Sequence, residues 1–274
     1  MGNKGGKSHG KTVAKLQPKT LSPSEKFQKI SDRFQTIEEV QEGLRECGLE
    51  SSNLIVGVDY TKSNTWNGKV TFGGKCLHHI EPDKVNPYQE VIWIMGQTLS
   101  VFDDDNLIPA FGFGDVTTKD KGVFPFFQDG RPSQGFQELL NRYTEITPMV
   151  QLSGPTSFAP LIREAIKIVQ QSQSYHILLI IADGQVDNVK ETTNAIVEAS
   201  KHPLSIVTIG VGDGPWDLME EFDDKLPQRQ FDNFQFVPFH STMEKAENRE
   251  ITFSVAALQE IPDQYTAIKK LGLL

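Results

Sequence analysis

The sequence predicts an α/β fold: a three-layer, doubly wound, mostly parallel sheet with helices on both faces. Short runs of Val, Ile and Leu, such as HILLIIA (176–182), lack the alternating polar residues of a half-exposed strand, which is typical of strands buried on both faces. Amphipathic helical segments, such as TSFAPLIREAIKIVQQS (156–172), separate these runs and provide the covering layers. The sequence shows no internal repeat of fixed period.

The first predicted element is a helix in TIEEVQEGLRECG (36–48). Thr36 followed by Glu39 forms a capping-box pattern, and Gly48 suits the C-cap. The other predicted elements are, in order, a strand at 54–58, a helix at 88–102, a strand at 107–114, a helix at 156–172, a strand at 176–182, a helix at 188–201, a strand at 204–212, a short helix at 216–224, a last strand at 234–239 and a closing helix at 252–261.

The N-terminal segment 1–24 differs from the rest of the chain. Five lysines precede the first acid, Glu25, among Gly, Ser and Thr. This segment has too little apolar surface to offset the entropy of ordering. We therefore expect a disordered basic tail at 1–24, followed by one folded domain at 25–274.

Composition excludes several classes of protein. The net charge of −9 argues against a general nucleic-acid binder, which needs a basic surface. Two cysteines, Cys47 and Cys76, exclude a disulfide framework and a Cys-rich zinc fold, and we expect reduced thiols in an intracellular, cytoplasmic protein. No apolar stretch reaches the roughly 18 residues of a membrane span, and no secretory signal is recognisable.

Polar side chains follow the first predicted strand at alternate positions. LIVGV (54–58) leads directly into Asp59, and Thr61 and Ser63 come two and four residues later. Alternate spacing lets an extended loop direct the Thr61 and Ser63 side chains to the same side. In an open parallel sheet, the carboxyl ends of the strands form the edge where ligands bind.

A second carboxylate belongs to the same edge. Asp183 follows the strand 176–182, and the loop SGPTSF, which opens a helix, contributes Thr156. Two carboxylates at neighbouring strand ends repel unless a cation or a proton lies between them. All these groups are hard oxygen donors, so together they suit Mg²⁺, Mn²⁺ or Ca²⁺.

Each of these residues also has a purely structural interpretation. An Asp after a strand often caps a helix or closes a turn, and Thr156 alone fits the N-cap of its helix. The combination of D-x-T-x-S at one strand end, a Thr loop and ADG at another strand end favours a metal site.

The motifs DYTKS (59–63), GPTSFAPLI (154–162) and IADG (181–184), in that order, resemble the metal-ion-dependent adhesion site of a von Willebrand factor A domain. Longer segments, including LSIVTIGVGDGPWDLMEEFDD (204–224) and FDNFQFV (231–237), resemble the copine-type A domain. They are most similar to the plant RING-domain ubiquitin ligases that carry this domain. The resemblance extends from about residue 27 to the C-terminus.

The resemblance implies a metal site on Asp59, Thr61, Ser63, Thr156 and Asp183, with Mg²⁺ as the expected ion and Mn²⁺ or Ca²⁺ as alternatives. It implies a module that recruits partner or substrate proteins, because an acidic side chain of a protein ligand completes the coordination sphere. It implies no catalysis by this chain itself, although the full-length plant relatives are ubiquitin ligases.

The sequence departs from those ligases in one respect. A RING domain needs a set of Cys and His zinc ligands, and this chain has two cysteines, both in its first third. We therefore expect either a fragment of a longer ligase or a relative without a RING. A copine's two C2 domains are likewise not expected in these 274 residues.

An alternative from another class is a haloacid-dehalogenase-like, Mg²⁺-dependent phosphohydrolase with Asp59 as its nucleophile. Such enzymes place D-x-D-x-T after the first strand and acidic metal ligands later, which DGQVD (183–187) superficially suits. Their second Asp is the general acid, and its position is Thr61 here. A hydroxyl cannot replace a carboxylic acid in protonating a leaving group at neutral pH.

The tail carries two further patterns. GGKSHGKT (5–12) matches a P-loop, but no strand precedes it, as that motif requires. Gly2 is a candidate for N-myristoylation, although Gly6 stands where Ser or Thr is usual. An acyl chain plus lysines would give peripheral attachment to the plasma membrane; the alternative is a soluble tail.

Three other groups of residues are weaker candidates. Cys76, His78 and His79 resemble half of a zinc site, with no second half evident. The acidic runs DDDN (103–106) and EEFDD (220–224) are expected to be solvated surface, with Ca²⁺ binding as the alternative.

Overall fold

The computed structural model describes residue 1 and residues 35–49, 52–100, 102–103, 105–184, 186–226, 228–244 and 246–274. Gly2, the lysines of the tail and the P-loop-like segment 5–12 lie outside these described residues. None of the helices in the described ranges combines the length and the hydropathy that a membrane span requires.

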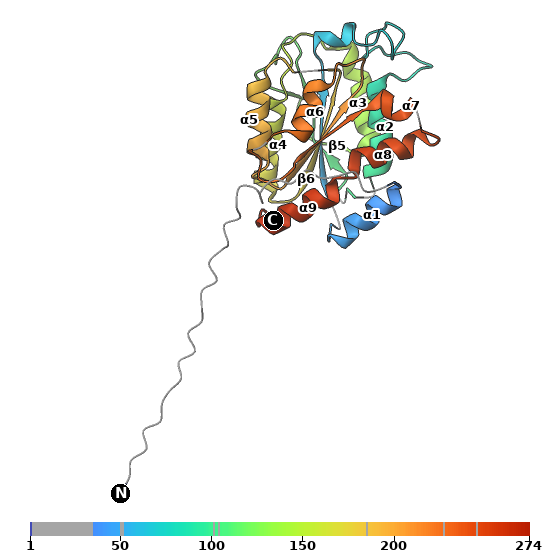
Figure 1. Ribbon diagram of the computed structural model, residues 1–274. Coiled ribbons are helices and arrows are strands. Elements are labelled where there is room, and N and C mark those ends of the chain that lie inside the picture. Colours follow the sequence, from blue (N-terminus) through green and yellow to red (C-terminus); the bar gives the residue numbers. More distant parts are fainter. Residues whose placement is uncertain are drawn as a thin grey trace.

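The expected alternation of strands and helices is confirmed (Figure 1). The strands are β1 (Asn53–Asp59), β2 (Leu107–Ile108), β3 (Ala110–Phe113), β4 (Phe124–Pro125), β5 (Ser133–Gln134), β6 (His176–Ala182), β7 (Leu204–Gly210) and β8 (Phe234–Pro238). The helices are α1 (Ile37–Glu46), α2 (Pro87–Leu99), α3 (Gly135–Ile146), α4 (Ala159–Ser172), α5 (Val189–Ala199), α6 (Asp217–Asp224), α7 (Phe239–Glu244), α8 (Arg249–Leu258) and α9 (Ile261–Leu271), with 3-10 helices η1 (Lys62–Thr65) and η2 (Thr147–Met149).

The main sheet has six strands in the order β4-β3-β1-β6-β7-β8. All neighbouring pairs are parallel except β3 and β4, which are antiparallel. The chain leaves β1 toward β3 on one side and later returns to place β6 on the other side of β1. The strand order therefore reverses between β1 and β6, and such a switch point is where open α/β sheets bind ligands.

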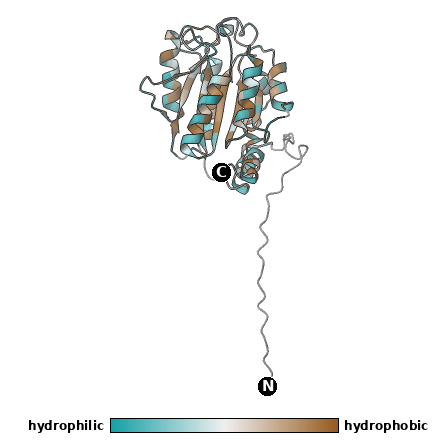
Figure 2. Cartoon of the chain, turned by 90° about the vertical axis from the view of Figure 1, so that its left-hand side faces the viewer, coloured by the Kyte–Doolittle hydropathy of each residue, from teal (hydrophilic) through white to brown (hydrophobic). Residues whose placement is uncertain are grey.

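Both faces of the sheet are buried, as the apolar strands predict. In β6, Ile177, Leu179 and Ile181 belong to one hydrophobic cluster, and Leu178 and Ile180 belong to the other. Helices α2, α3 and α8 cover the first face, and α4, α5 and α6 cover the second. Figure 1 shows these two layers on opposite sides of the strands, and Figure 2 shows the hydrophobic sides of the helices turned toward them.

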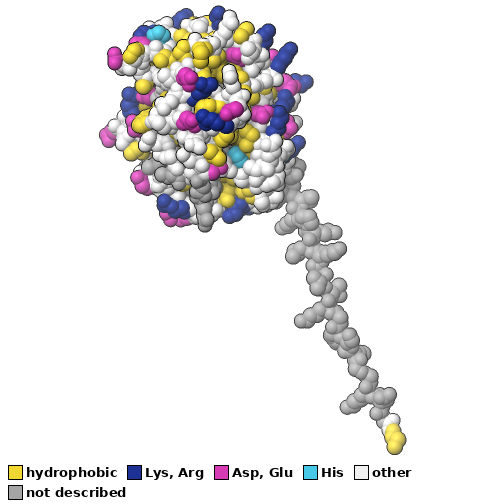
Figure 3. All heavy atoms as spheres, turned by 180° about the vertical axis from the view of Figure 1, so that it is seen from behind, with side chains coloured by type: hydrophobic (Ala, Val, Ile, Leu, Met, Phe, Trp, Pro, Cys, Tyr) yellow, Lys and Arg dark blue, Asp and Glu magenta, His cyan; other side chains and the backbone are white. Residues whose placement is uncertain are grey.

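Helix α1 lies at the end of the sheet opposite the candidate site, where it contacts α8 and α9 (Figure 1). Its capping box is formed as predicted: the Thr36 side chain accepts from the Glu39 backbone N–H, and the Glu39 carboxylate accepts from the Thr36 backbone N–H. Gly48 follows the helix with a φ of +80°. Charged side chains of both signs are interspersed over the face seen in Figure 3.

Two predicted elements differ from the structure, and one region contains elements that were not predicted. The predicted strand 107–114 is divided at Pro109 into β2, which pairs with β5, and β3, which pairs with β1; proline has no N–H to donate to a ladder. The predicted closing helix 252–261 corresponds to α8, which ends at Leu258, and a further helix, α9, begins at Ile261 with Pro262 in its first turn, where proline is tolerated. Between 115 and 150, where no element was predicted, the structure contains β4, β5, α3 and η2.

Candidate metal site

The site lies at the carboxyl ends of β1 and β6, on the two sides of the switch point. Val58 is the register partner of Ile181, so both strands end at the same level. Asp59 is the last residue of β1, and Asp183 directly follows β6. Both side chains are buried. The strand order, and not the distance along the chain, brings these two carboxylates together.

The loop after β1 is held in shape by hydrogen bonds of its own side chains. The Thr61 backbone N–H donates to Asp59 Oδ1 at 2.7 Å. The chain then turns into η1, which brings the Thr61 and Ser63 hydroxyl oxygens to 2.9 Å from each other. Ser63 Oγ donates to Asp183 Oδ1 at 2.9 Å, so Thr61 is left to donate to Ser63. Four of the five predicted residues therefore form one connected cluster.

The two carboxyl groups interact directly with each other. Burial raises the pKa of Asp59, and burial together with the charge of Asp59 raises the pKa of Asp183 well above its usual range. Asp59 Oδ2 is completely buried and makes no hydrogen bond of normal geometry with the described donor groups, although the Asp59 carboxyl group lies within reach of the Asp183 carboxyl group. A buried acceptor without a partner is costly, and a cation beside it would remove both this cost and the repulsion between the acids.

Thr156 reaches the same edge on a different loop. A bridge between Thr61 and Ser153 and a 2.6 Å hydrogen bond from Lys62 N–H to the Ser153 carbonyl place this loop beside the β1 loop. Asp187 anchors it by accepting from the Thr156 N–H at 2.7 Å. In the described part of the chain, no hydrogen bond joins the Thr156 hydroxyl to the other four side chains.

The N-cap interpretation of Thr156 is wrong. Helix α4 begins at Ala159, its N-cap residue is Phe158, and no side chain caps it. The buried Thr156 hydroxyl therefore has no capping role and remains available as an oxygen donor at the edge of the cluster.

Sequence reasoning missed two asparagines that support the site. Asn67 Nδ2 donates to the Asp183 carbonyl at 3.1 Å and to Asp183 Oδ2 at 3.2 Å. The buried Asn64 Nδ2 donates to the Thr61 carbonyl at 3.0 Å and to the Asp59 carbonyl at 3.4 Å. Both lie just beyond D-x-T-x-S, but no spacing rule assigns such a role to them.

The half zinc site proposed for Cys76, His78 and His79 is not formed. His78 is buried between the rings of Tyr60 and Tyr88, and its two nitrogens bond to the Asp59 carbonyl and to Tyr143. His79 is exposed and lies next to Glu81. Burial lowers the pKa of His78 to about 3, so its ring is neutral at physiological pH.

The donor set fits a hard divalent cation. The cluster contains two carboxylates and hydroxyl oxygens, with a further hydroxyl on the Thr156 loop, and Mg²⁺, Mn²⁺ and Ca²⁺ prefer such oxygen ligands. Asp59, Asp183, Thr61 and Ser63 are the residues that would hold the ion, with Thr156 adjacent. The buried, unpartnered Asp59 Oδ2 is the structural observation that this fit explains.

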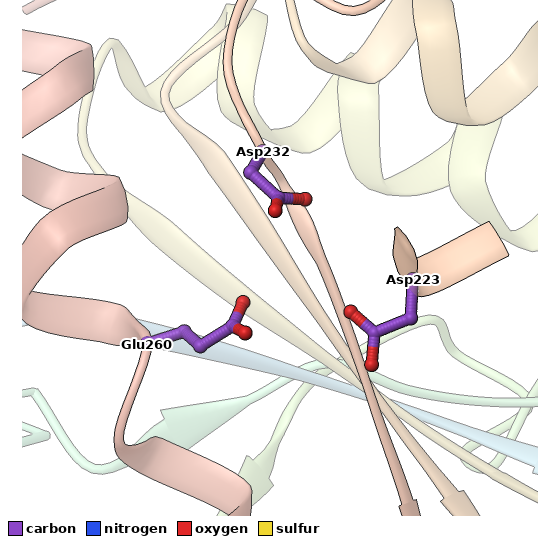
Figure 4. Close-up of side chains that lie close together, drawn as sticks. All are labelled: Asp223, Asp232 and Glu260. Carbon is purple, nitrogen blue, oxygen red and sulfur yellow. The ribbon is translucent and has the colours of Figure 1, made fainter. Parts of the chain in front are cut away.

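A second acidic cluster has a different character (Figure 4). Asp223, Asp232 and Glu260 direct their carboxyl groups toward one another. The buried Arg229 lies 2.8 Å from Asp232, and its charge interacts with all three acids, so the protein supplies a cation of its own. The expectation that 220–224 and 103–106 are solvated surface is wrong at Asp103, which is buried, and at Asp223, which is partly buried.

An α/β sheet whose switch point presents D-x-T-x-S, a Thr loop and a second strand-end Asp defines a von Willebrand factor A type domain with the layout of a metal-ion-dependent adhesion site. The family model for copines, described as "Copine", matches residues 76–274. The chain belongs to the copine family.

Curated relatives agree with this assignment. The chain is 51% identical over 265 residues to E3 ubiquitin-protein ligase RGLG1 of Arabidopsis thaliana, covering 91% of this chain and 54% of that protein. It is 51% identical over 259 residues to RGLG3 of the same plant, covering 89% and 70%. It is 52% identical over 244 residues to Copine family protein 2 of Caenorhabditis elegans, covering 88% and 3%. The chain therefore spans little more than half of RGLG1 and a small part of the nematode protein.

Solved structures are similar at a lower level. The manganese-loaded TRAP protein of Plasmodium vivax matches with a TM-score of 0.48 and 14% identity, covering 70% of each chain. The family membership rests on the sequence relatives. It does not favour the phosphohydrolase alternative, and Thr61, at the position of that enzyme's general acid, is engaged with Ser63 in the loop.

Proposed function

We propose that this domain is a divalent-metal-dependent protein-binding module. Copine-type A domains are protein-interaction modules. The further proposal for this chain is that its own residues bind the metal on which the interaction depends. Asp59, Thr61, Ser63 and Asp183 would hold Mg²⁺, with Thr156 beside them. An acidic side chain of a partner protein would complete the coordination sphere of the ion.

The buried Asp59 Oδ2, without a partner and beside a second carboxyl group, is the observation that carries the proposal. Two ionised acids nearly balance the charge of a divalent cation, and the remaining ligand position suits a partner's carboxylate. Such a site recognises a carboxylate and rejects the isosteric amide, because the amide brings no negative charge to the ion.

The first experiment is a calorimetric titration of the metal-free protein with MgCl₂ and MnCl₂. We expect saturable binding by the wild type and no binding by Asp183→Ala. Asp83→Asn, which changes an exposed acid in the loop before α2, serves as the control and should bind like the wild type. Equal binding by wild type and Asp183→Ala would refute the site.

The second experiment tests recognition with a peptide array. Each peptide carries one Glu and is matched with a copy carrying Gln. We expect capture of Glu peptides in Mg²⁺, loss of capture in EDTA, and no capture of the Gln copies. Capture that is equal for both members of each pair would refute recognition of a carboxylate, even if the metal binds.

The role of the domain in a ligase is also a proposal, since the chain spans 54% of RGLG1. We propose that it positions a protein substrate for ubiquitination by a RING on the same polypeptide. A Cys/His zinc pattern encoded directly after Leu274 in the transcript would support this arrangement, and a stop codon at that point would contradict it.

A further inference from the structure

His78 lies directly beneath the metal-site loop although it is 19 residues from Asp59 in the sequence. Its ring is stacked between Tyr60 and Tyr88, with centroid distances of 4.6 and 4.1 Å. Nε2 is 2.7 Å from the Asp59 carbonyl oxygen, and Nδ1 is 2.8 Å from the Tyr143 hydroxyl. Both polar atoms of this buried side chain are therefore engaged.

The chemistry of the partners assigns the protons. A carbonyl oxygen only accepts, so Nε2 must carry the proton and donate to Asp59. In the neutral ring, Nδ1 then accepts, and the Tyr143 hydroxyl donates to it. The Tyr143 oxygen in turn accepts from Asn86 Nδ2 at 3.1 Å. Asn86 is the N-cap of α2 and forms a capping box with Gln89, so the chain of hydrogen bonds ends on a rigid helix terminus.

A second connection runs parallel to the first. The Tyr88 hydroxyl of α2 donates to Asn64 Oδ1 at 2.7 Å. Asn64 donates from its other side to the carbonyl oxygens of Thr61 and Asp59. The backbone of the site loop is thus linked to α2 through His78, by way of Tyr143, and through Asn64. Of these two side chains, His78 is the closer to the Asp59 carbonyl oxygen, at 2.7 Å against 3.4 Å for Asn64.

We propose that His78 is a positioning residue of the metal site: by donating from Nε2 to the Asp59 carbonyl, it fixes the peptide that carries the Asp59 carboxylate and so raises the affinity for the metal. The inference rests on the proposed metal-binding function. A ligand held by surrounding hydrogen bonds binds with less loss of conformational entropy, and loss of such supporting contacts typically weakens metal binding by about 10–100-fold.

Matched variants test this role. His78→Phe keeps an aromatic ring between Tyr60 and Tyr88 but removes the donor, and His78→Gln places an amide N–H near the position of Nε2. We expect His78→Phe to weaken Mn²⁺ binding by about 10-fold or more and His78→Gln to restore part of the loss. His79→Gln, which changes the exposed neighbour, is the control and should bind Mn²⁺ like the wild type.

Urea unfolding in EDTA separates positioning from general stability. If the loss of Mn²⁺ affinity in His78→Phe and His78→Gln parallels the loss of unfolding free energy in each variant, His78 has only a structural role and the proposal fails. If His78→Gln, compared with His78→Phe, regains a larger part of the Mn²⁺ affinity than of the unfolding free energy, the proposal holds. Wild-type protein that binds no Mn²⁺ would instead refute the proposed function.

The proton assignment is tested on the metal-free wild type, which avoids any variant that fails to fold. A two-bond ¹H–¹⁵N correlation spectrum distinguishes the two tautomers of each histidine. We expect a neutral His78 with its proton on Nε2. A His78 protonated on Nδ1 alone could not donate to Asp59, and this result would overturn the inference whether or not the protein binds metal.

Discussion

The Ser63 hydroxyl donates to Asp183 at 2.9 Å, across 120 residues of sequence, and so joins the loop after β1 to the end of β6. This contact exists because β1 and β6 are parallel neighbours that end at the same level. The same arrangement of the two strands brings Asp183 into contact with Asp59. The electrostatics of this pair of acids lead to the first prediction.

Asp59→Asn should have opposite effects on stability with and without metal. In EDTA, the variant removes one of two interacting buried acids, and Asn keeps an acceptor for the Thr61 N–H. We expect its free energy of unfolding at pH 8 to exceed that of the wild type by on the order of 1–3 kcal/mol, since each unit of pKa shift corresponds to about 1.4 kcal/mol. In saturating Mg²⁺ the wild type should be the more stable protein.

Urea unfolding monitored by circular dichroism, with and without Mg²⁺, measures both effects. Asp83→Asn, at an exposed position, controls for the loss of one negative charge. An Asp59→Asn variant that is stabilised by Mg²⁺ as much as the wild type would contradict the assignment of Asp59 as a ligand.

Gly114→Ala should disturb the site through Thr61. Gly114 has a φ of +82°, and a Cβ there would lie 2.3 Å from Thr61 Cγ2. Gly130 has a similar φ of +76°, and a Cβ there would meet nothing within 4 Å. Both alanine variants suffer the strain of a positive φ, roughly 1–2 kcal/mol, but only Gly114→Ala displaces a proposed metal ligand.

We therefore expect Gly130→Ala to bind Mg²⁺ like the wild type and Gly114→Ala to bind it at least about 10-fold more weakly. Calorimetric titration of the two folded variants provides the comparison. Equal affinities would mean that the position of Thr61 does not matter to the ion.

Asp223→Asn should change the dependence of stability on pH. Burial raises the pKa of Asp223 to about 7, well above the value of about 4 for an unfolded chain. Between these pH values the folded state binds a proton that the unfolded state lacks, so this residue's contribution to stability is lost as the pH rises from 4 through 7. Asn keeps an oxygen acceptor for the Phe236 N–H without the buried charge.

Urea unfolding in EDTA at pH 5 and pH 8 measures this difference. The variant should gain on the order of 1–3 kcal/mol relative to the wild type between the two pH values. Glu220→Gln changes an exposed acid of the same helix and should follow the wild type. A constant difference between Asp223→Asn and the wild type would show that Asp223 does not titrate in this range.

The N-terminal tail yields a prediction that the sequence alone supports. If Gly2 is acylated, purified N-myristoyltransferase should label the wild-type chain, and Gly2→Ala should remain unlabelled. One acyl chain binds membranes only marginally, and lysines near an anionic surface add about 1 kcal/mol each. Labelled protein should therefore bind vesicles containing phosphatidylserine and dissociate in high salt; an unlabelled wild type would favour a soluble tail.

Local sequence patterns predicted the parts of the fold that depend on neighbouring residues. A continuous apolar run such as 176–182 is buried on both faces wherever it lies in the sheet. Thr36 and Glu39 form their capping box within a single turn. Pro109 shows the limit of this reasoning, since it divides a segment that hydropathy alone predicts as a single strand.

The sequence by itself determined that Asp59 and Asp183 end buried strands and that hydroxyls follow the first of them, because strand ends and alternate spacing are local properties. Only the tertiary structure decided that β1 and β6 are neighbours, which brings the two acids into contact. It alone showed Asn67 bonded to Asp183 and His78 beneath Asp59. These contacts depend on packing between distant segments, and no spacing in the sequence encodes them.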